Sequence, residues 1–331
     1  MTAATTPPGY QPLFDPGAAT QPFDPDRAYR LGDRSTAAAL PYVYDADITL
    51  AVNVALAAGR PLLVRGHPGT GKSSLARSVA ERLAWRFYPV TVSSRTSARD
   101  LQWSFDTVAR LADAQALPPG SALPPHARYV VPGALWWAFD PASAARRGLD
   151  PADAAGDPGF APAQDPTPVN PGAGRSVVLI DEIDKADPDV PNDLLVPLGS
   201  YQFQVEDGPP VTAAHPPLVI ITTNEERELP RAFLRRCVIL ALAAPDAERL
   251  REIAAAHFGA LDPQLLDAVQ VVYLRIRAER IDAKEPPPSV AEFLDTLASC
   301  RGLGLAPADA NWKDLATLLL AKVTAIPPEQ P

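Results

Sequence analysis

Cysteine is scarce in this chain: only Cys237 and Cys300 occur among its 331 residues. Two thiols so far apart exclude a disulfide framework and a zinc ribbon, and we expect both to lie reduced in or near the core. The sequence also lacks any run of about 18 apolar residues, which excludes a membrane-spanning helix. Its first residues show no basic region followed by an apolar stretch. We therefore expect a cytoplasmic protein without a membrane partner.

Positive charge is in short supply as well. The chain has 30 Lys and Arg against 39 Asp and Glu, for a formal net charge of −9. Nucleic-acid binding usually requires a basic stripe, so this balance argues against nucleic acid as a partner, although it leaves room for a local basic groove. The hydrophobic fraction of 47% is sufficient for a core. The length suits about two domains.

Proline, by contrast, is abundant, with 39 residues. Average proteins contain about 5% proline, so part of this chain must form loops or tails. Residues 1–35 are interpreted as an extended N-terminal tail, which Phe14, Phe23 and Tyr29 could pin to a surface. Asp-Pro pairs recur at about 140–175. Because Asp-Pro favours turns and opposes helix continuation, we expect an irregular insertion there.

Short apolar runs predict the strands of a sheet. They lie at 61–66, 88–93, 176–182, 217–224 and 237–242. The runs are apolar throughout and alternate with helical patterns at 47–58, where Asp47 is the expected cap and Gly59 the end, and at 72–84. This alternation predicts an α/β fold, with a five-stranded parallel sheet covered by helices on both faces, over residues 36–244.

After Pro245 the pattern becomes helical only. Candidate helices lie at 246–259, 262–280, 289–301 and 307–324. Ser289 and Glu292 form a predicted capping box at the start of the third. We therefore expect a small all-helical domain over residues 245–331.

Residues 66–73, the phosphate loop, read GHPGTGKS and fit the phosphate-binding pattern G-x-x-x-x-G-K-[ST]. Its glycines let backbone N–H groups point at phosphate oxygens, and the following helix directs its positive end to the same place. Lys72 would neutralise the β- and γ-phosphates of ATP, and Ser73 would offer its hydroxyl to magnesium (Mg²⁺). The residues predicted to bind the nucleotide here are Gly66, Pro68, Gly69, Thr70, Gly71, Lys72, Ser73 and Ser74.

Two carboxylates follow four apolar residues at the end of the strand 176–182, where ligands bind in α/β proteins. Asp181 would hold Mg²⁺, directly or through water, and Glu182 would polarise an attacking water. The guanine-recognition motif N-K-x-D does not occur, which argues against a GTPase. A base for a hydroxyl acceptor is not evident either, which argues against a kinase. Hydrolysis of ATP is the reaction that the pair favours.

Polar residues also end the strand 217–224 and precede the last strand. Asn224 could hold the water between Glu182 and the γ-phosphate, or it could simply cap the next turn. Arg235 and Arg236 could reach the nucleotide of a neighbouring subunit as arginine fingers. Alternatively, the two arginines could simply form the solvated, basic end of a helix.

Together these residues resemble an AAA+ ATPase, and more narrowly the MoxR family, over about 36–325. The segments that carry the resemblance are GRPLLVRGHPGTGKSSLA, VVLIDEIDKADPDVPNDLL, LVIITTNEERELPRAFLRRC and PDAERLREIAAAHF. The resemblance implies a five-stranded αβα core, a helical lid and a ring of subunits, usually a hexamer. It implies that Asn224 is the sensor-1 residue and that Arg236, with Arg235 as a second candidate, is the finger. It also implies chaperone-like activation of partners, often proteins with a von Willebrand factor A domain.

The same resemblance assigns further segments. Residues 201–218 resemble the hairpin before sensor 1. Residues 129–139 resemble an insert whose loops line the ring pore, so Trp136 and Trp137 become candidates for substrate contact, with core packing as the alternative. By position alone, Tyr42 and Val43 would pack on adenine.

The lid departs from the family pattern. Ala291 and Glu292 stand where an arginine, the sensor-2 residue, is often found, so that residue is either absent or replaced by Lys284. The stretch 140–175 is also longer than the family's usual connection.

The resulting prediction is a Mg²⁺-dependent ATPase ring that remodels a protein partner. Two alternatives stay open. An ATP-binding switch or scaffold with little hydrolysis is favoured by the unsettled sensor 2 and opposed by Glu182. A DNA-acting ring motor is opposed by the net charge of −9.

Overall fold

A computed structural model describes residues 12–17, 41–118, 123–157, 160–167, 174–206 and 208–307, together with Asp309, Trp312 and Leu320. The chain divides into two compact units. The described part of the first, the sheet unit, comprises 12–17, 44–65 and the described residues of 79–241. The described part of the second, the helical unit, comprises 41–43, the phosphate-loop segment 66–78 and the described residues from 242 onward.

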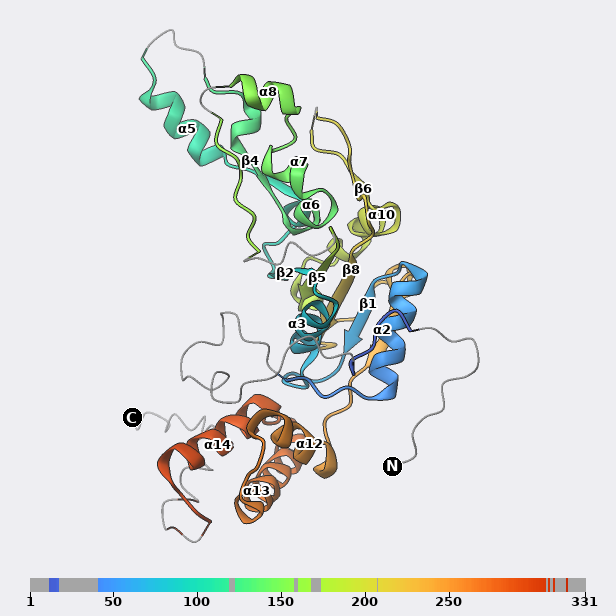
Figure 1. Cartoon of the computed structure of the whole chain (residues 1–331), viewed down its shortest axis with the longest axis vertical. Coiled ribbons are helices and arrows are strands. Elements are labelled where there is room, and N and C mark those ends of the chain that lie inside the picture. Colours follow the sequence, from blue (N-terminus) through green and yellow to red (C-terminus); the bar gives the residue numbers. More distant parts are fainter. Residues whose placement is uncertain are drawn as a thin grey trace, which may run out of the picture. The chain divides into compact units, whose positions relative to one another are not determined.

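A parallel sheet forms the centre of the sheet unit (Figure 1). Its strands in the described part of the chain are β1 (Leu62–Arg65), β2 (Arg86–Thr91), β5 (Ser176–Asp181), β8 (Leu218–Thr223) and β9 (Val238–Ala241). They lie in the order β2-β5-β8-β1-β9, and every neighbouring pair is parallel. The interior strands β5 and β8 are buried along almost their whole length, as their apolar sequences require. The predicted five-stranded parallel sheet is confirmed, and each strand begins and ends within two residues of its predicted bounds.

Helix α2 (Ala46–Ala58) packs on β1 and β9. Its cap is Asp45, whose carboxylate accepts the backbone N–H of Ile48 at 2.7 Å. The prediction of Asp47 as the cap is therefore wrong: Asp47 lies inside the first turn, where its charge suits the helix dipole. Gly59 ends the helix in the left-handed conformation, as predicted. Helix α3 (Lys72–Leu83) follows the phosphate loop.

Residues 12–17 are anchored to α2. The side chain of Asn53 accepts the backbone N–H of Phe14 and donates to its carbonyl oxygen, both at 2.8 Å. Phe14 is 1% exposed, and the centroid of its ring lies 5.4 Å from that of the Tyr44 ring. Phe23 and Tyr29, the other two predicted anchors, lie outside the described residues.

Short elements connect β2 to β5. They are α4 (Ala98–Gln102), β3 (Trp103–Phe105), α5 (Thr107–Ala116), the 3₁₀ turn η1 (His126–Tyr129), β4 (Val130–Pro132), α6 (Ala134–Phe139), α7 (Pro141–Ala145) and α8 (Pro151–Gly156). Strands β3 and β4 pair antiparallel. Helix α6 packs on β2 and β5 and carries the buried residues Leu135 to Phe139.

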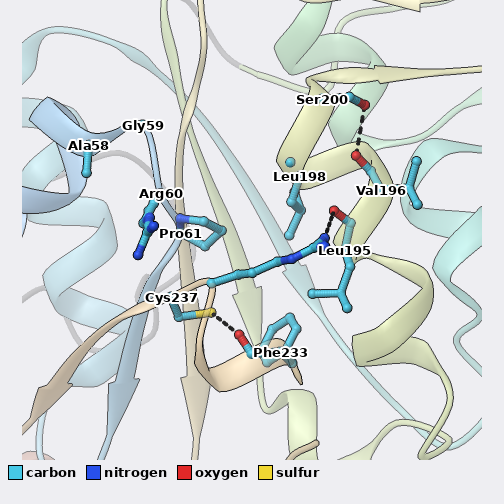
Figure 2. Close-up of a pocket in the computed structure, with 12 residues that line it drawn as sticks. Ala58, Gly59, Arg60, Pro61, Leu195, Val196, Leu198, Ser200, Phe233 and Cys237 are labelled. Atoms are coloured by element: carbon cyan, nitrogen blue, oxygen red, sulfur yellow. Dashed lines mark hydrogen bonds between the residues drawn. The ribbon is translucent and has the colours of Figure 1, made fainter. Parts of the chain in front are cut away.

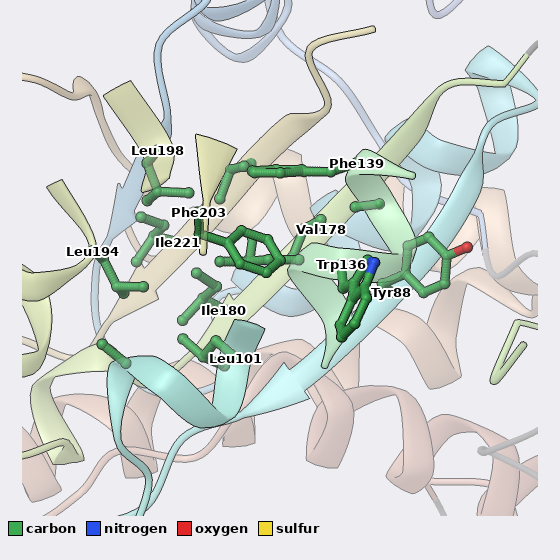
Figure 3. Close-up of a cluster of buried hydrophobic side chains, with 14 of the residues drawn as sticks. Tyr88, Leu101, Trp136, Phe139, Val178, Ile180, Leu194, Leu198, Phe203 and Ile221 are labelled. Carbon is green, nitrogen blue, oxygen red and sulfur yellow. The ribbon is translucent and has the colours of Figure 1, made fainter. Parts of the chain in front are cut away.

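The tryptophans of α6 belong to the main core (Figure 3). Trp136 is 0% and Trp137 4% exposed, and the Trp136 ring meets that of Phe203 edge-on at 6.2 Å. The hypothesis that these residues contact a substrate is therefore wrong, and the alternative of core packing holds. The buried area that two indole rings contribute explains why the core retains them.

The Asp-Pro stretch is more ordered than predicted. Asp140 caps α7 by accepting the N–H of Ser143, and Asp150 caps α8 by accepting that of Ala152. The following proline is in each case the first helical residue, where its missing N–H costs nothing. Asp-Pro thus starts helices here, and the expectation of an irregular insertion is wrong for 141–145 and 151–156. Residues 158–159 and 168–173 lie outside the described part of the chain.

The chain returns to the sheet through a second group of short elements. They are the 3₁₀ turn η2 (Ile183–Lys185), α9 (Val190–Asp193), α10 (Leu195–Ser200), β6 (Gln202–Phe203) and β7 (Val211–Thr212), with α11 (Arg231–Leu234) between β8 and β9. Strands β6 and β7 form an antiparallel hairpin of two residues each, within the segment 201–218 that resembles the hairpin before sensor 1.

Helices α12 (Ala247–Phe258), α13 (Pro263–Asp282) and α14 (Val290–Leu303) form the helical unit's core. Their N-terminal caps are Asp246, Asp262 and the predicted capping box of Ser289 and Glu292. The candidate helix at 307–324 falls almost entirely outside the described residues. Among the residues that the structure describes, no helix is long and apolar enough to cross a membrane.

Candidate functional site

The phosphate loop is held in a conformation that only glycine adopts easily. Gly66 has φ 152° and Gly69 has φ 76°. A β-carbon on Gly66 would lie 2.5 Å from the carbonyl oxygen of Leu242, and one on Gly69 would overlap Cβ of Ser289. Both the backbone conformation and the space therefore require glycine.

The lysine of the loop is oriented by the loop itself. Lys72 is 6% exposed, and its Nζ donates to the carbonyl oxygens of Gly66 at 2.7 Å and His67 at 2.8 Å. The hydroxyl of Thr70 donates to the same His67 carbonyl at 3.0 Å. Ser73 and Ser74 are exposed at the start of α3. The positive charge is thus fixed inside the curl of the backbone, where a phosphate group would bind.

The N-terminus of α14 contacts the loop within the helical unit. The backbone N–H of Val290 donates to the carbonyl oxygen of Gly69 at 3.1 Å. The Glu292 carboxylate accepts the N–H of Ser289 at 2.6 Å and completes the capping box. The first turn of α14 therefore presents a carboxylate and no cation. Lys284 is exposed, just beyond the end of α13.

The segment predicted to contact adenine also lies beside the loop. A β-carbon on Gly71 would be 3.4 Å from the ring of Tyr42. The carbonyl oxygen of Val43 accepts from Nη2 of Arg249 on α12 at 2.7 Å. On the same helix, burial lowers the pKa of His257 to about 4, opposed by a smaller effect of a hydrogen bond to the Pro41 backbone. Helix α12 therefore fixes residues 41–43 with an arginine and a neutral histidine.

In the sheet unit, polar residues meet where β5 and β8 end. Asp181, Glu182, Thr222 and Asn224 are here called the acid edge. The Thr222 hydroxyl donates to Oδ1 of Asp181 at 2.5 Å and accepts the backbone N–H of Glu182 at 2.9 Å. Glu182 itself has φ 61°, a left-handed conformation that is costly for a residue with a side chain. The threonine thus secures both acids at a strained turn.

The Glu182 carboxylate has partners on both oxygens. Oε1 accepts from Nδ2 of Asn224 at 3.3 Å, and Oε2 accepts from Nζ of Lys185 at 2.8 Å. The pKa of Lys185 is raised, mainly because its ammonium donates this hydrogen bond to Glu182. The structure therefore brings together Asp181, Glu182 and Asn224, as predicted, and adds Lys185.

Arg235 and Arg236 belong to a different part of the sheet unit. Arg236 lines a cavity of about 540 Å³ between the end of α2, α10 and α11, together with Arg60, Leu195 and Phe233 (Figure 2). Its Nη1 donates to the carbonyl oxygen of Leu195 at 3.2 Å. Arg235 is exposed at the end of α11. None of the acid-edge residues lines this cavity.

Comparison with known families decides the class of protein. The family model of the AAA domain, dynein-related subfamily, matches residues 61–237. That range is more than half of the chain and runs from β1 through the phosphate loop and the acid edge to both arginines. The chain belongs to this AAA family.

Individual relatives match either over a short segment or over most of this chain at low sequence identity. A segment of 75 residues is 39% identical to the aerobic cobaltochelatase subunit CobS of Sinorhizobium sp., and covers 22% of this chain and 23% of that protein. RuvB, the Holliday junction branch migration motor of Thermotoga maritima, has a TM-score of 0.42 and 15% identity over 82% of this chain and 65% of its own. A mutant of the same RuvB has a TM-score of 0.44 and 14% identity over 82% of this chain and 67% of its own.

The AAA domain contains site residues that sequence reasoning missed. In the sequence, Thr222 is simply part of a predicted strand, and Lys185 and Asp184 are parts of a longer motif. Lys185 meets Glu182, three residues before it, through the 3₁₀ turn η2, which the sequence pattern does not predict. For Thr222 and Asp184 the partners lie 40 to 42 residues away, on another strand, and no local pattern points to them.

Proposed function

We propose that this AAA domain protein is a Mg²⁺-dependent ATP hydrolase of the MoxR-like type, which assembles as a ring and remodels a protein partner. The observation that carries the proposal is the contact of Glu182 with Asn224 beside Asp181. A carboxylate next to a polar amide at the end of interior strands is the arrangement that can activate and orient a water molecule.

The phosphate loop supplies nucleotide binding in this proposal. Its backbone N–H groups and the Lys72 ammonium would neutralise the phosphates, with Ser73 and Ser74 exposed at the start of α3. The Ser73 hydroxyl and the Asp181 carboxylate are oxygen donors of the kind that Mg²⁺ prefers when it is shared with phosphates. When bound, the ion would polarise the phosphoryl group and neutralise its developing charge.

The acid edge supplies the proton acceptor. Glu182 would take the proton of a water that Asn224 orients. Lys185 holds the same carboxylate at 2.8 Å, so we expect this ion pair to loosen before Glu182 accepts a proton. Thr222 keeps Asp181 and the Glu182 backbone in place during that change.

The arginines would act between subunits. Arg236, with Arg235 as the second candidate, is exposed, and no acid-edge residue lines the cavity beside it. A role at the nucleotide of a neighbouring subunit is consistent with this exposed position.

A protein partner is supported by two resemblances. The sequence is similar to the MoxR family, whose members act on proteins that often contain a von Willebrand factor A domain. The partial match to CobS is a match to a subunit of a larger enzyme. We infer that this chain, too, works on another protein.

An ATP-binding switch with little hydrolysis is the second candidate. The ion pair between Lys185 and Glu182 favours it, because the lysine ammonium occupies one of the two carboxylate oxygens that would otherwise be open to water. The first turn of α14 favours it too, because that turn presents the carboxylate of Glu292 and no cation.

The test is phosphate release measured against protein concentration, with wild type alone and with wild type mixed with Arg236→Ala. The proposal predicts that specific activity rises with protein concentration. It also predicts that Arg236→Ala lowers the activity of the mixture by more than the fraction of variant protein in it. A flat, near-zero rate with ATP still bound would favour the switch. Activity that is independent of concentration and unaffected by mixing would contradict the ring.

A further inference from the structure

Asp184 is a buried carboxylate without a role in the proposed chemistry. It lies in η2, two residues after Glu182, and is 3% exposed. Burying a carboxylate is costly unless hydrogen bonds compensate for the lost water. The groups that form hydrogen bonds with Asp184 therefore indicate the role of this residue.

One oxygen of Asp184 holds the turn that carries Asn224. Oδ2 accepts the backbone N–H of Asn224 and that of Glu226, each at 3.1 Å. The N–H between them, of Glu225, donates to Oγ1 of Thr223 at 3.0 Å. All three consecutive amides of the turn are thus bound by side chains, and Glu225 has a left-handed φ of 60°.

The other oxygen, Oδ1, is buried and has no hydrogen-bond partner among the described residues. Both side-chain hydrogen bonds of this carboxylate in the described residues are therefore made to the turn 224–226. A second link runs in parallel, because Nη1 of Arg227 donates to the carbonyl oxygen of Ala186 at 3.4 Å. Both links join the segment after β8 to the segment after β5.

We propose that Asp184 is a positioning residue: it fixes the backbone of the turn 224–226 so that the Asn224 amide faces Glu182. The proposal rests on the proposed function, since Asn224 and Glu182 act in ATP hydrolysis there. Asp184 touches neither nucleotide nor water in this account. It acts through the backbone of Asn224, while the Asn224 side chain meets Glu182 at 3.3 Å.

The chemistry of position 184 distinguishes suitable variants. Asp184→Ala removes the acceptor and leaves two part-buried N–H groups without this partner. Asp184→Asn keeps one oxygen that can accept both N–H groups, although the bonds are weaker without the charge. Asp187→Ala is the matched control, because Asp187 is exposed and, among the residues that the structure describes, its carboxylate accepts only the nearby N–H of Asp189.

The first experiment measures kcat, KM and nucleotide affinity of the full chain. We expect Asp184→Ala to lower kcat about 100-fold, the size of effect that a misplaced catalytic group can have, with KM and affinity within about threefold. Asp184→Asn should recover about a tenth of wild-type kcat or more, and Asp187→Ala should match wild type. Equal losses of affinity and kcat, or no recovery by Asn, would overturn the proposal.

A double-mutant cycle with Asn224→Ala separates positioning from general destabilisation. If Asp184 acts through Asn224, the double variant has the kcat of Asn224→Ala alone, within about twofold. Its melting temperature should still lie below that of Asn224→Ala alone, because the N–H groups of residues 224 and 226 lose their acceptor as well. A kcat loss that multiplies across the two changes would overturn the proposal.

Amide hydrogen exchange tests the inference without any reliance on activity. The N–H groups of Asn224 and Glu226 should exchange at least about tenfold faster in Asp184→Ala than in wild type, with Asp187→Ala unchanged. Unaltered exchange would overturn the proposal. If wild type hydrolyses no ATP, the proposed function fails while this readout still judges Asp184. If Asp184→Ala does not fold, the intermediate exchange rate expected of Asp184→Asn decides instead.

Discussion

The phosphate loop and the acid edge are built in opposite ways. The loop binds Lys72 to its own carbonyl oxygens, five and six residues away, and needs glycine at fixed positions. The acid edge depends on residues 40 to 42 positions apart that meet only because β5 and β8 are neighbours in the sheet. Local chemistry therefore specifies the first site, and the pairing of strands specifies the second.

The largest expected effect concerns the loop. Lys72→Ala removes the ammonium that would neutralise the phosphates, and we expect nucleotide affinity to fall about 10- to 100-fold. Arg275→Ala, at an exposed arginine of α13 that pairs only with nearby Glu279 among the ion pairs of the described residues, should leave affinity unchanged. Titration with a fluorescent ATP analogue measures both. Undiminished binding by Lys72→Ala would show that the loop is not the nucleotide site.

Gly69→Ala tests whether the loop tolerates any side chain. The added β-carbon would overlap Cβ of Ser289 while φ stays at 76°, so we expect a loss of stability of about 2 kcal/mol and weaker nucleotide binding. Thermal denaturation and nucleotide titration give the two values. Gly156→Ala is the control, since a β-carbon there meets nothing within 4 Å. Equal behaviour of the two variants would contradict the close contact.

Thr222→Val tests the hydrogen bonds that hold the acid edge together. The change preserves shape but removes the hydroxyl between Asp181 and the Glu182 backbone, leaving a part-buried N–H without its partner. We expect a loss of stability of about 1–2 kcal/mol and slower turnover, with nucleotide affinity little changed. Denaturant unfolding and steady-state kinetics measure these. Thr212→Val, on the exposed side of β7, should alter neither.

Lys185→Met has the smallest expected effect. The ion pair with Glu182 is part-exposed, at 42% and 31% for the two side chains, so stability should change little. Basal turnover, followed by phosphate release, should rise by about threefold at most, because Glu182 loses the ammonium that competes for its electron pair. A fall in turnover would mean that Lys185 assists the reaction rather than restraining it.

The same difference between local and long-range contacts explains how much of the fold and the site can be predicted from the sequence. The loop motif, the acid pair, Asn224 and the strands follow from local patterns and strand apolarity. The bonds of Thr222 and Asp184 depend on the register Ile180↔Ile221, which no local pattern contains. The error at Trp136 and Trp137 has a different cause. The sequence pattern around these residues is the same in an exposed insert and in a core, so it does not show that they are buried.

Local capping chemistry explains the remaining differences. Asp45 and Asp47 both precede apolar helical positions, and only the backbone conformation selects Asp45 as the cap. Asp-Pro reads as a turn signal, yet at Asp140 and Asp150 the same pair supplies a cap and a first helical residue. In each case a single residue type serves two local structures, and the surrounding packing chooses between them.

The most direct test of the account is to measure ATP affinity and phosphate release side by side in wild type and Glu182→Gln. We predict that the variant binds ATP as tightly as wild type, within about threefold, and loses turnover by about 1,000-fold, since a positioned general base contributes on that scale. Retained turnover in Glu182→Gln would contradict the assignment of the acid edge as the site of hydrolysis.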